Sequence, residues 1–76
     1  MAQLLSPLPG TFYRRPAPDK PSYKEDGDIV AMGDVIGLIE VMKSFNEVKA
    51  DSSGKITFAA ENEEPVMAGQ LLAEIA

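Results

Sequence analysis

The sequence predicts an all-β fold, either a sandwich or a barrel of short strands. Short runs rich in Val, Ile and Leu alternate with clusters of Gly, Pro, Asp, Asn and Ser, which favour turns. The six Gly and six Pro residues interrupt the long segments, so no window shows a sustained helical period of apolar residues. Many short strands separated by frequent turns are typical of sandwiches and barrels.

Length and composition indicate one small domain, residues 1–76, that depends on its core for stability. A chain of 76 residues buries only about 60% of the surface that it exposes when unfolded. It has no Cys for a disulfide, and without Cys and His it lacks the usual ligands of a structural metal site. We therefore expect a compact β-domain with one continuous core, monomeric in isolation.

The composition also argues against several classes of function. Without His and Cys, the chain lacks the commonest general base and thiol nucleophile, so an enzyme built on its remaining carboxylates, Ser, Lys and Tyr would be an unusual one. Its net charge of −5 disfavours nucleic acid or an anionic membrane as a partner. There is no apolar run of about 20 residues and no signal-peptide pattern, so we expect a cytoplasmic protein. The acidic clusters, Asp26/Asp28 and Glu61/Glu63/Glu64, lack the spacing of a calcium loop, so no metal site is expected.

The first third of the chain predicts short strands on either side of a long loop. Residues 1–5 are expected to be frayed or a weak edge strand, and the turn-rich residues 6–10 lead into a strand at 11–13. Residues 14–22 contain three prolines, which cannot donate to a ladder, so we expect a loop that protrudes from the sheet. Residues 23–28 have polar strand and turn character.

The remaining strands follow from apolar runs between turn residues. The run at 35–39 is apolar on both alternating faces, as expected for a strand that is covered on both sides. Further strands are expected at 45–50, 55–60, 66–67 and 71–75, with turns at 51–54 and 61–65.

The stretch around Lys43 predicts an unusual hairpin. Residues 39–48 form two strand-like runs joined by a very short connection, and such tight turns usually contain Asn-Gly or Asp-Gly. Here the tip is Met42-Lys43-Ser44. A positive φ at Met42 or Lys43 would cost roughly 1–3 kcal/mol, and such strain tends to persist where function requires it. The sequence therefore predicts a lysine held at the tip of a rigid hairpin.

A weak internal repeat lies on either side of this hairpin. Residues 30–36 align with residues 66–72, at an offset of 36, and residues 10–12 align with residues 54–56, at an offset of 44. The difference between the offsets predicts eight extra residues in the first half, for which the proline-rich loop 15–22 is the obvious candidate.

The hairpin also resembles a known family. Residues 40–43 read Glu-Val-Met-Lys, which is similar to the Glu-Ala-Met-Lys signature of biotinyl domains, whose lysine is acylated by biotin. Residues 6–13 resemble the opening of the carrier domains of bacterial acetyl-CoA carboxylases, and residues 50–54 resemble the segment after their hairpin. The likeness extends from about residue 5 to residue 75. It implies a flattened, eight-stranded β-barrel or sandwich of the biotinyl/lipoyl type with quasi-two-fold symmetry, in which loop 15–22 would be the protrusion called the thumb.

The resemblance implies a biotin carboxyl carrier, with biotin covalently attached to Lys43. A biotin protein ligase would attach the cofactor, because an ordinary lysine amine is protonated at neutral pH and is a poor nucleophile. A biotin carboxylase would load a carboxyl group and a carboxyltransferase would unload it, with acetyl-CoA carboxylase and fatty acid synthesis as the expected setting. The carrier would then be a non-catalytic subunit.

The residues next to Lys43 help to separate this interpretation from its alternatives. Lipoyl domains share the fold but present Asp-Lys-Ala at the tip, whereas this chain presents Met42 before the lysine. An exposed Met suits a partner's apolar pocket, although it could also fill a gap in the core. Glu40 matches a position that is commonly acidic and could help a ligase to select the lysine. A lipoyl carrier, or an unmodified β-barrel interaction module with an inert Lys43, remain the alternatives.

Three positions depart from the family pattern. Val41 replaces the common Ala, and Ser44 replaces the common Met after the lysine. Both changes could slow biotinylation by a foreign ligase. Arg15 stands where the resembling carriers have a hydroxyl residue that contacts biotin from the thumb. Together with Arg14 it forms the only adjacent basic pair in the chain, and such a pair is usually solvated.

Overall fold

The computed structural model describes residues 2–76 and confirms the all-β prediction. It has eight strands, which are β1 (Ala2–Leu5), β2 (Gly10–Tyr13), β3 (Ile29–Val30), β4 (Val35–Val41), β5 (Ser44–Lys49), β6 (Gly54–Phe58), β7 (Glu64–Val66) and β8 (Leu71–Ile75). Within residues 2–76 there is no helix long and apolar enough to cross a membrane.

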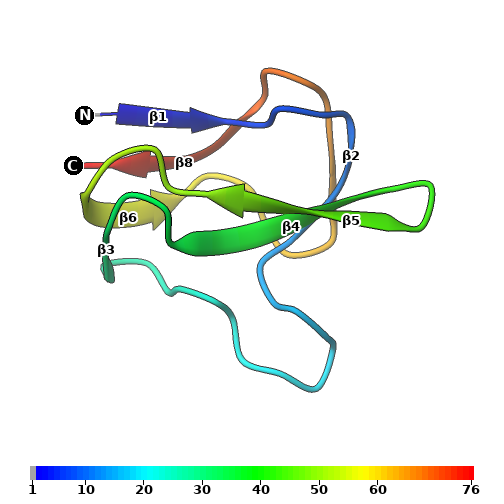
Figure 1. Cartoon of the computed structure of the whole chain (residues 1–76), viewed down its shortest axis with the longest axis horizontal. Coiled ribbons are helices and arrows are strands. Elements are labelled where there is room, and N and C mark those ends of the chain that lie inside the picture. The colour runs from blue at the N-terminus through cyan, green and yellow to red at the C-terminus, as the bar shows by residue number, and fades with distance from the viewer. Residues whose placement is uncertain (1) are drawn as a thin grey trace.

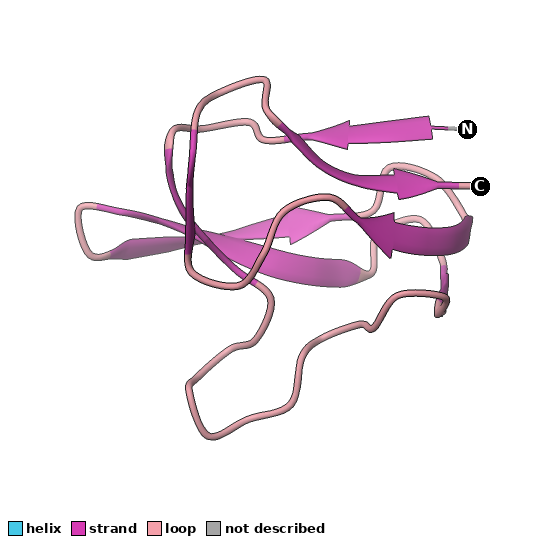
Figure 2. Ribbon diagram, turned by 180° about the vertical axis from the view of Figure 1, so that it is seen from behind, coloured by secondary structure: helices cyan, strands magenta, loops and turns pink. Residues whose placement is uncertain are grey.

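The strands form two antiparallel sheets of four strands each, packed as a flattened sandwich (Figures 1 and 2). One sheet has the order β1-β8-β6-β3 and the other has the order β5-β4-β2-β7. The overall extents of 31 × 28 × 19 Å reflect this flattening. The β4–β5 hairpin extends beyond the sandwich at one end, and both chain termini lie side by side at the opposite end, where β1 pairs with β8 (Figure 1).

Most expected strands are present, but the strand expected at 55–60 ends at Phe58, and two further expectations were wrong in detail. No strand forms between Tyr13 and Ile29, so residues 23–28 have the predicted turn but not the strand character. The predicted turn at 61–65 ends early, because Glu64 and Pro65 already belong to β7. β7 is an edge strand, where a proline without an N–H is tolerated. At the N-terminus, Ala2–Leu5 is an edge strand of the other sheet, and Met1 lies outside the described residues.

The internal repeat is confirmed by matching turns in the two halves. Gly33 and its mate Gly69 have φ angles of 94° and 85°, in the left-handed region that glycine adopts without strain. Gly33 donates its N–H to Ala50 O at 2.8 Å, and Gly69 donates to Ser6 O at 2.7 Å. These bonds close equivalent turns before β4 and β8, so the two halves share their backbone geometry as well as their sequence pattern.

A second pair of matching contacts locates the break in the repeat. The Arg14 N–H donates to Asn62 Oδ1 and the Phe58 N–H donates to Asp26 Oδ1, both at 2.8 Å. Asp26 follows Arg14 by 12 positions, whereas Asn62 follows Phe58 by four. The eight additional residues of the first half therefore fall between Arg14 and Asp26.

The core lies between the sheets and draws on nearly every strand. Its largest fully buried side chains are Phe12, Val30, Ile36, Ile39, Ile56 and Leu72. Gly37 in β4 lies against one of them, because a Cβ at this position would sit 2.6 Å from the ring of Phe12 and 2.7 Å from Tyr13 O. The absence of a side chain at Gly37 thus allows β2 and β4 to approach closely.

Candidate functional site

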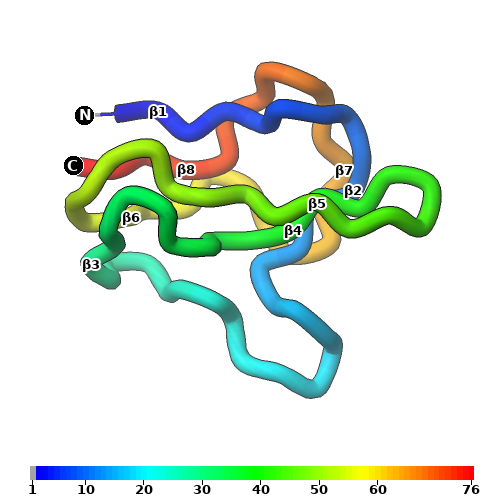
Figure 3. Tube along the Cα trace, in the orientation of Figure 1, coloured from blue at the N-terminus to red at the C-terminus, as the bar shows by residue number. Residues whose placement is uncertain are grey.

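Lys43 lies at the tip of the β4–β5 hairpin, in a two-residue turn. Val41 pairs with Ser44, which leaves only Met42 and Lys43 between the strands. Their φ angles are 49° and 67°, and positive φ at both positions is what a type I′ turn requires. Neither residue is Gly, Asn or Asp, so the strain expected from the sequence is present at both positions. The long strands on either side fix the direction of the turn (Figure 3).

The tip presents its side chains to solvent. Lys43 is exposed, and Met42 is 93% exposed, so Met42 does not fill a gap in the core. The salt bridges found within residues 2–76 join Lys24 to Asp34 and Lys49 to Glu47, and neither involves Lys43. The Lys43 amine is therefore held away from the sandwich without an internal carboxylate partner.

The residues beside the tip have different environments. Val41 is half-buried and packs against the core, which anchors the hairpin, whereas Ser44 at the start of β5 is exposed. Glu40 lies on the outer face of the sheet, where its Oε1 accepts a hydrogen bond from the Tyr13 hydroxyl at 3.0 Å. That hydrogen bond is the main reason why the pKa of Tyr13 is raised above its ordinary value. The carboxylate of Glu40 is thus oriented by β2 rather than by Lys43.

An aromatic pair extends this outer face toward the long loop. Phe45 lies opposite Glu40 in the β4–β5 ladder and is 60% exposed. Its ring centroid is 6.2 Å from that of Tyr13, in a tilted arrangement that aromatic rings favour. Leu38, which pairs with Tyr13, is only 8% exposed although it lies outside the core cluster. The loop that follows Tyr13 lies over this face.

A pocket of about 240 Å³ separates this loop from the sheet. Loop residues Arg15, Pro16, Ala17 and Pro18 form one side, and Tyr13, Phe45, Asn62 and Glu63 form the other. Arg15 is half-buried, and its Nε is inaccessible to solvent and has no hydrogen-bond partner. The pocket is therefore mainly apolar, and Arg15 lines it although its Nε is covered by the protein.

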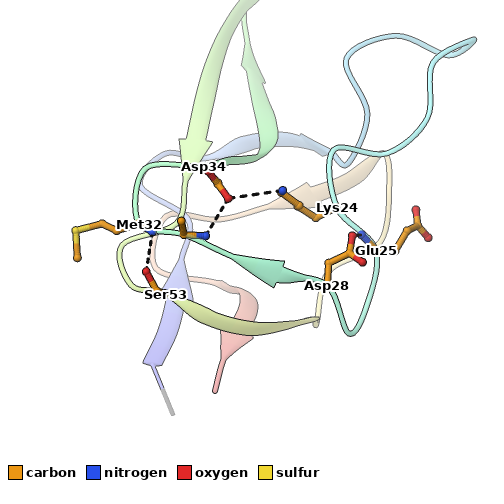
Figure 4. A network of polar contacts seen from close by, with 7 residues as sticks. Lys24, Glu25, Asp28, Met32, Asp34 and Ser53 are labelled. Atoms are coloured by element: carbon orange, nitrogen blue, oxygen red, sulfur yellow. Dashed lines mark hydrogen bonds and ion pairs between the residues drawn. The ribbon is translucent and has the colours of Figure 1, made fainter.

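The base of the loop is fixed at both ends. At its start, the guanidinium of Arg14 lies 4.1 Å from the ring centroid of Phe58, so the expectation of a solvated Arg14–Arg15 pair was wrong. The Tyr23 N–H donates to Arg14 O at 2.9 Å and closes the loop across its neck. At its end, Lys24 Nζ lies 3.6 Å from Asp34 Oδ2, which also accepts the Ala31 N–H (Figure 4). These contacts hold the loop against the sandwich.

The sequence alone identified Arg15 but missed its neighbours in the pocket. Tyr13 and Phe45 could have been found from strand alternation, because both lie on the face opposite the core residue Phe12. Asn62 and Glu63 belong to the segment 61–65, for which the sequence predicts an acidic turn and no metal site. Glu63 has a φ of 65°, a strained conformation for which the sequence offered no signal.

The sequence of the chain matches a known family and several known proteins. Residues 2–75 match the family described as "Biotin-requiring enzyme". The chain is 47% identical over 72 residues to the biotin carboxyl carrier protein of acetyl-CoA carboxylase from Chlamydia pneumoniae, an alignment that covers 93% of this chain and 43% of that protein. It is 43% identical over 76 residues to the protein of the same name from Nostoc sp., covering 99% of this chain and 42% of the relative. The chain thus spans less than half the length of these relatives.

Proposed function

Because the chain belongs to the family of biotin-requiring enzymes, we propose that it is a biotin carboxyl carrier with biotin attached to Lys43. The observation that carries this proposal is the Lys43 amine, exposed and without a carboxylate partner at the tip of a strained two-residue turn. An amine in this position suits acylation by a separate enzyme, since its approach is unobstructed and its direction is fixed.

The attachment reaction is an acyl transfer to Lys43 Nζ. Lys43 Nζ would hold biotin as an amide: a separate ligase would activate the carboxyl group of biotin, the activating group would leave, and the lysine ammonium would lose two protons to the surroundings. One positive charge disappears, so the formal net charge changes from −5 to −6. The ligase would recognise the surface around the lysine, which is formed by Glu40, Val41, Met42 and Ser44.

The role of the domain after attachment is positional. When bound, biotin supplies a ureido nitrogen that can carry a carboxyl group. The chain contributes a rigid support, and tethering to this support raises the effective concentration of the cofactor at an enzyme's active site. A carrier of this kind does no catalysis by itself.

We also propose the partners and setting. The relatives' names point to acetyl-CoA carboxylase, so a biotin protein ligase, a biotin carboxylase and a carboxyltransferase are the proposed partners, and fatty acid synthesis in the cytoplasm is the proposed setting. The domain itself is proposed to be a monomer that binds neither nucleic acid nor membranes.

Residues 15–22 are proposed to be the inserted thumb of a single biotinyl domain, residues 1–76. Two observations support this assignment. The matched contacts of the two halves leave eight extra residues between Arg14 and Asp26, and the Tyr23–Arg14 backbone bond encloses residues 15–22. With Arg15 at its start, this thumb faces the outer side of the sheet close to the Lys43 hairpin.

The decisive experiment is intact mass spectrometry after co-expression with a biotin ligase. We expect a single biotinyl adduct that is absent from Lys43→Arg. A lipoyl adduct, or a biotinyl adduct that persists in Lys43→Arg, would refute the assignment.

A second variant tests the geometry of the tip. Exchanging Met42 and Lys43 moves the amine by one position without changing composition or net charge. Successive residues project in different directions, so we expect an unchanged fold by circular dichroism and a sharp loss of biotinylation. Equal labelling of the exchanged protein would mean that the ligase reads only an exposed lysine.

A further inference from the structure

The sulfur chemistry of this chain is confined to methionine, and the described methionines lie on the surface. The chain has four methionines and no cysteine, so its thioethers are the sulfur groups that a two-electron oxidant can attack. Met42 is 93% exposed, and Met32 and Met67 are each 70% exposed. The core cluster found within residues 2–76 contains no methionine. Oxidation of these three side chains can therefore change the surface of the domain without disturbing its core.

Met42 differs from the other two in its position beside Lys43. The two residues alone form the turn between Val41 and Ser44, and consecutive Cα atoms are about 3.8 Å apart. An enzyme that brings a reacting group to Lys43 Nζ therefore also comes close to Met42. Met32 precedes β4, and the seven residues of that strand separate it from the hairpin tip by about 20 Å (Figure 1). Met32 is thus an exposed methionine that an enzyme at the tip does not need to approach.

We propose that Met42 is a redox modification site, at which oxidation of the thioether to the sulfoxide by a hydroperoxide slows the acylation of Lys43. The inference rests on the proposed function, because its consequence is measured as attachment of biotin to Lys43. In the modification step, the sulfur of Met42 attacks one oxygen of hydrogen peroxide. The S–O bond forms, the O–O bond breaks, and water leaves. Sulfur is oxidised by two electrons and the peroxide is reduced by two.

The sulfoxide changes what the tip offers to a partner protein. A methionine side chain is apolar, flexible and polarisable, and it adapts to an apolar pocket. Its sulfoxide is polar and chiral, so a partner that covers the thioether would have to bury a strong acceptor without supplying a donor. Oxidation of Met42 should therefore weaken productive docking of the tip, whereas oxidation of Met32 should not.

The test compares the unmodified chain before and after treatment with hydrogen peroxide, with the oxidant removed by catalase before a biotin ligase is added. Peptide mass spectrometry locates the added oxygen atoms, and circular dichroism verifies the fold. We expect Met42 to be oxidised at least as fast as Met32, with the fold unchanged. We also expect kcat/KM of the ligase for the oxidised chain to fall about tenfold, equivalent to about 1.4 kcal/mol. Methionine sulfoxide reductases with a dithiol, which is oxidised to a disulfide as the oxygen leaves in water, should restore the rate.

Two variants separate Met42 from the other methionines. Met32→Leu removes an exposed thioether far from the tip and should remain sensitive to peroxide. Met42→Leu is compared with its own rate before treatment, and the ratio of the two rates should be close to one. Resistance of Met42 to oxidation, equal rates for the oxidised and untreated chain, an unfolded oxidised chain, or continued sensitivity in Met42→Leu would each overturn the proposal.

The result is distinguishable from a failure of the proposed function. If Lys43 is not the site of biotin attachment, the untreated chain already fails the mass experiment. If Met42 has no influence on attachment, the untreated chain gains its biotinyl adduct and the oxidised chain gains it at the same rate.

Discussion

Replacing the tip of the hairpin with an Asn-Gly pair, through the substitutions Met42→Asn and Lys43→Gly, should stabilise the domain while removing the lysine that we propose as the site of biotin attachment. Both residues now occupy the left-handed region, with φ angles of 49° and 67°, and each costs roughly 1–2 kcal/mol there. Asn and Gly are the residues that favour this turn, although Gly gives back about 0.5–1 kcal/mol through the greater entropy of the unfolded chain. The net gain should be about 1–2 kcal/mol, which in a domain of this size raises Tm by about 4–8 °C per kcal/mol.

The assay is thermal unfolding followed by circular dichroism, with HN–Hα coupling constants used to verify that the turn geometry is retained. Glu63→Asn is a matched control, because Glu63 has a similar φ of 65° in a turn outside the hairpin. It should raise Tm as well, while leaving Lys43 available for biotinylation. If the double variant keeps the turn geometry but shows no increase in Tm, the positive φ angles of the tip store no strain, and the functional argument drawn from them fails.

Three further outcomes follow from the fold. Gly37→Ala should destabilise the domain by about 1–3 kcal/mol in urea unfolding, because the new methyl group would overlap a core ring 2.6 Å away. In a Tyr23→Phe background, absorbance titration of Tyr13 should give a pKa above its ordinary value that falls in Glu40→Gln; since the folded state holds this proton more tightly, stability should decline as pH rises through that pKa. Deleting residues 15–22 should leave the sandwich folded, with a loss of about 1–3 kcal/mol from exposing apolar surface on the outer face of the sheet, and collapse of the fold would show that the loop belongs to the core.

Most of the strands and turns could be predicted from the sequence, because they depend on local signals. The turns before β4 and β8 could be aligned by their glycines, and the strands follow apolar runs of the right length. The hairpin tip was also predictable, because a turn of two residues leaves few backbone solutions. What failed was local detail at the ends of elements, such as the start of β7 at Glu64, where edge position rather than composition decides whether Pro65 is accommodated.

The pocket could not be predicted, because it joins residues that are distant in the chain. Arg15, Phe45 and Glu63 meet only after the two sheets are formed and the long loop is placed over one of them. The sequence contained no signal that the guanidinium of Arg14 would stack on Phe58 or that the Nε of Arg15 would be covered by the protein. Contacts of this kind depend on tertiary packing, to which neither periodicity nor turn propensity is sensitive.

The quasi-two-fold repeat allows the outer faces of the two sheets to be compared position by position. On the outer face of one sheet, Thr57 pairs with Glu74, two polar residues suited to solvent. At the equivalent positions of the other sheet, Tyr13 pairs with Leu38, and these less polar side chains lie beneath the long loop. The core does not require this difference, because the matching inward pairs, Phe12 with Ile39 and Ile56 with Ile75, are apolar in both sheets.

The two halves therefore differ where the proposed site lies. Glu40 has Ala76 as its repeat mate, so the carboxylate that Tyr13 holds near the tip has no counterpart in the other half. The inserted loop and its Arg15 likewise belong to the first half alone, on the side of the sandwich that carries Lys43. The apolar core between the two sheets requires none of these differences. Their concentration around one hairpin is what we expect if that end of the domain, rather than the sandwich as a whole, is shaped by attachment and handling of a cofactor.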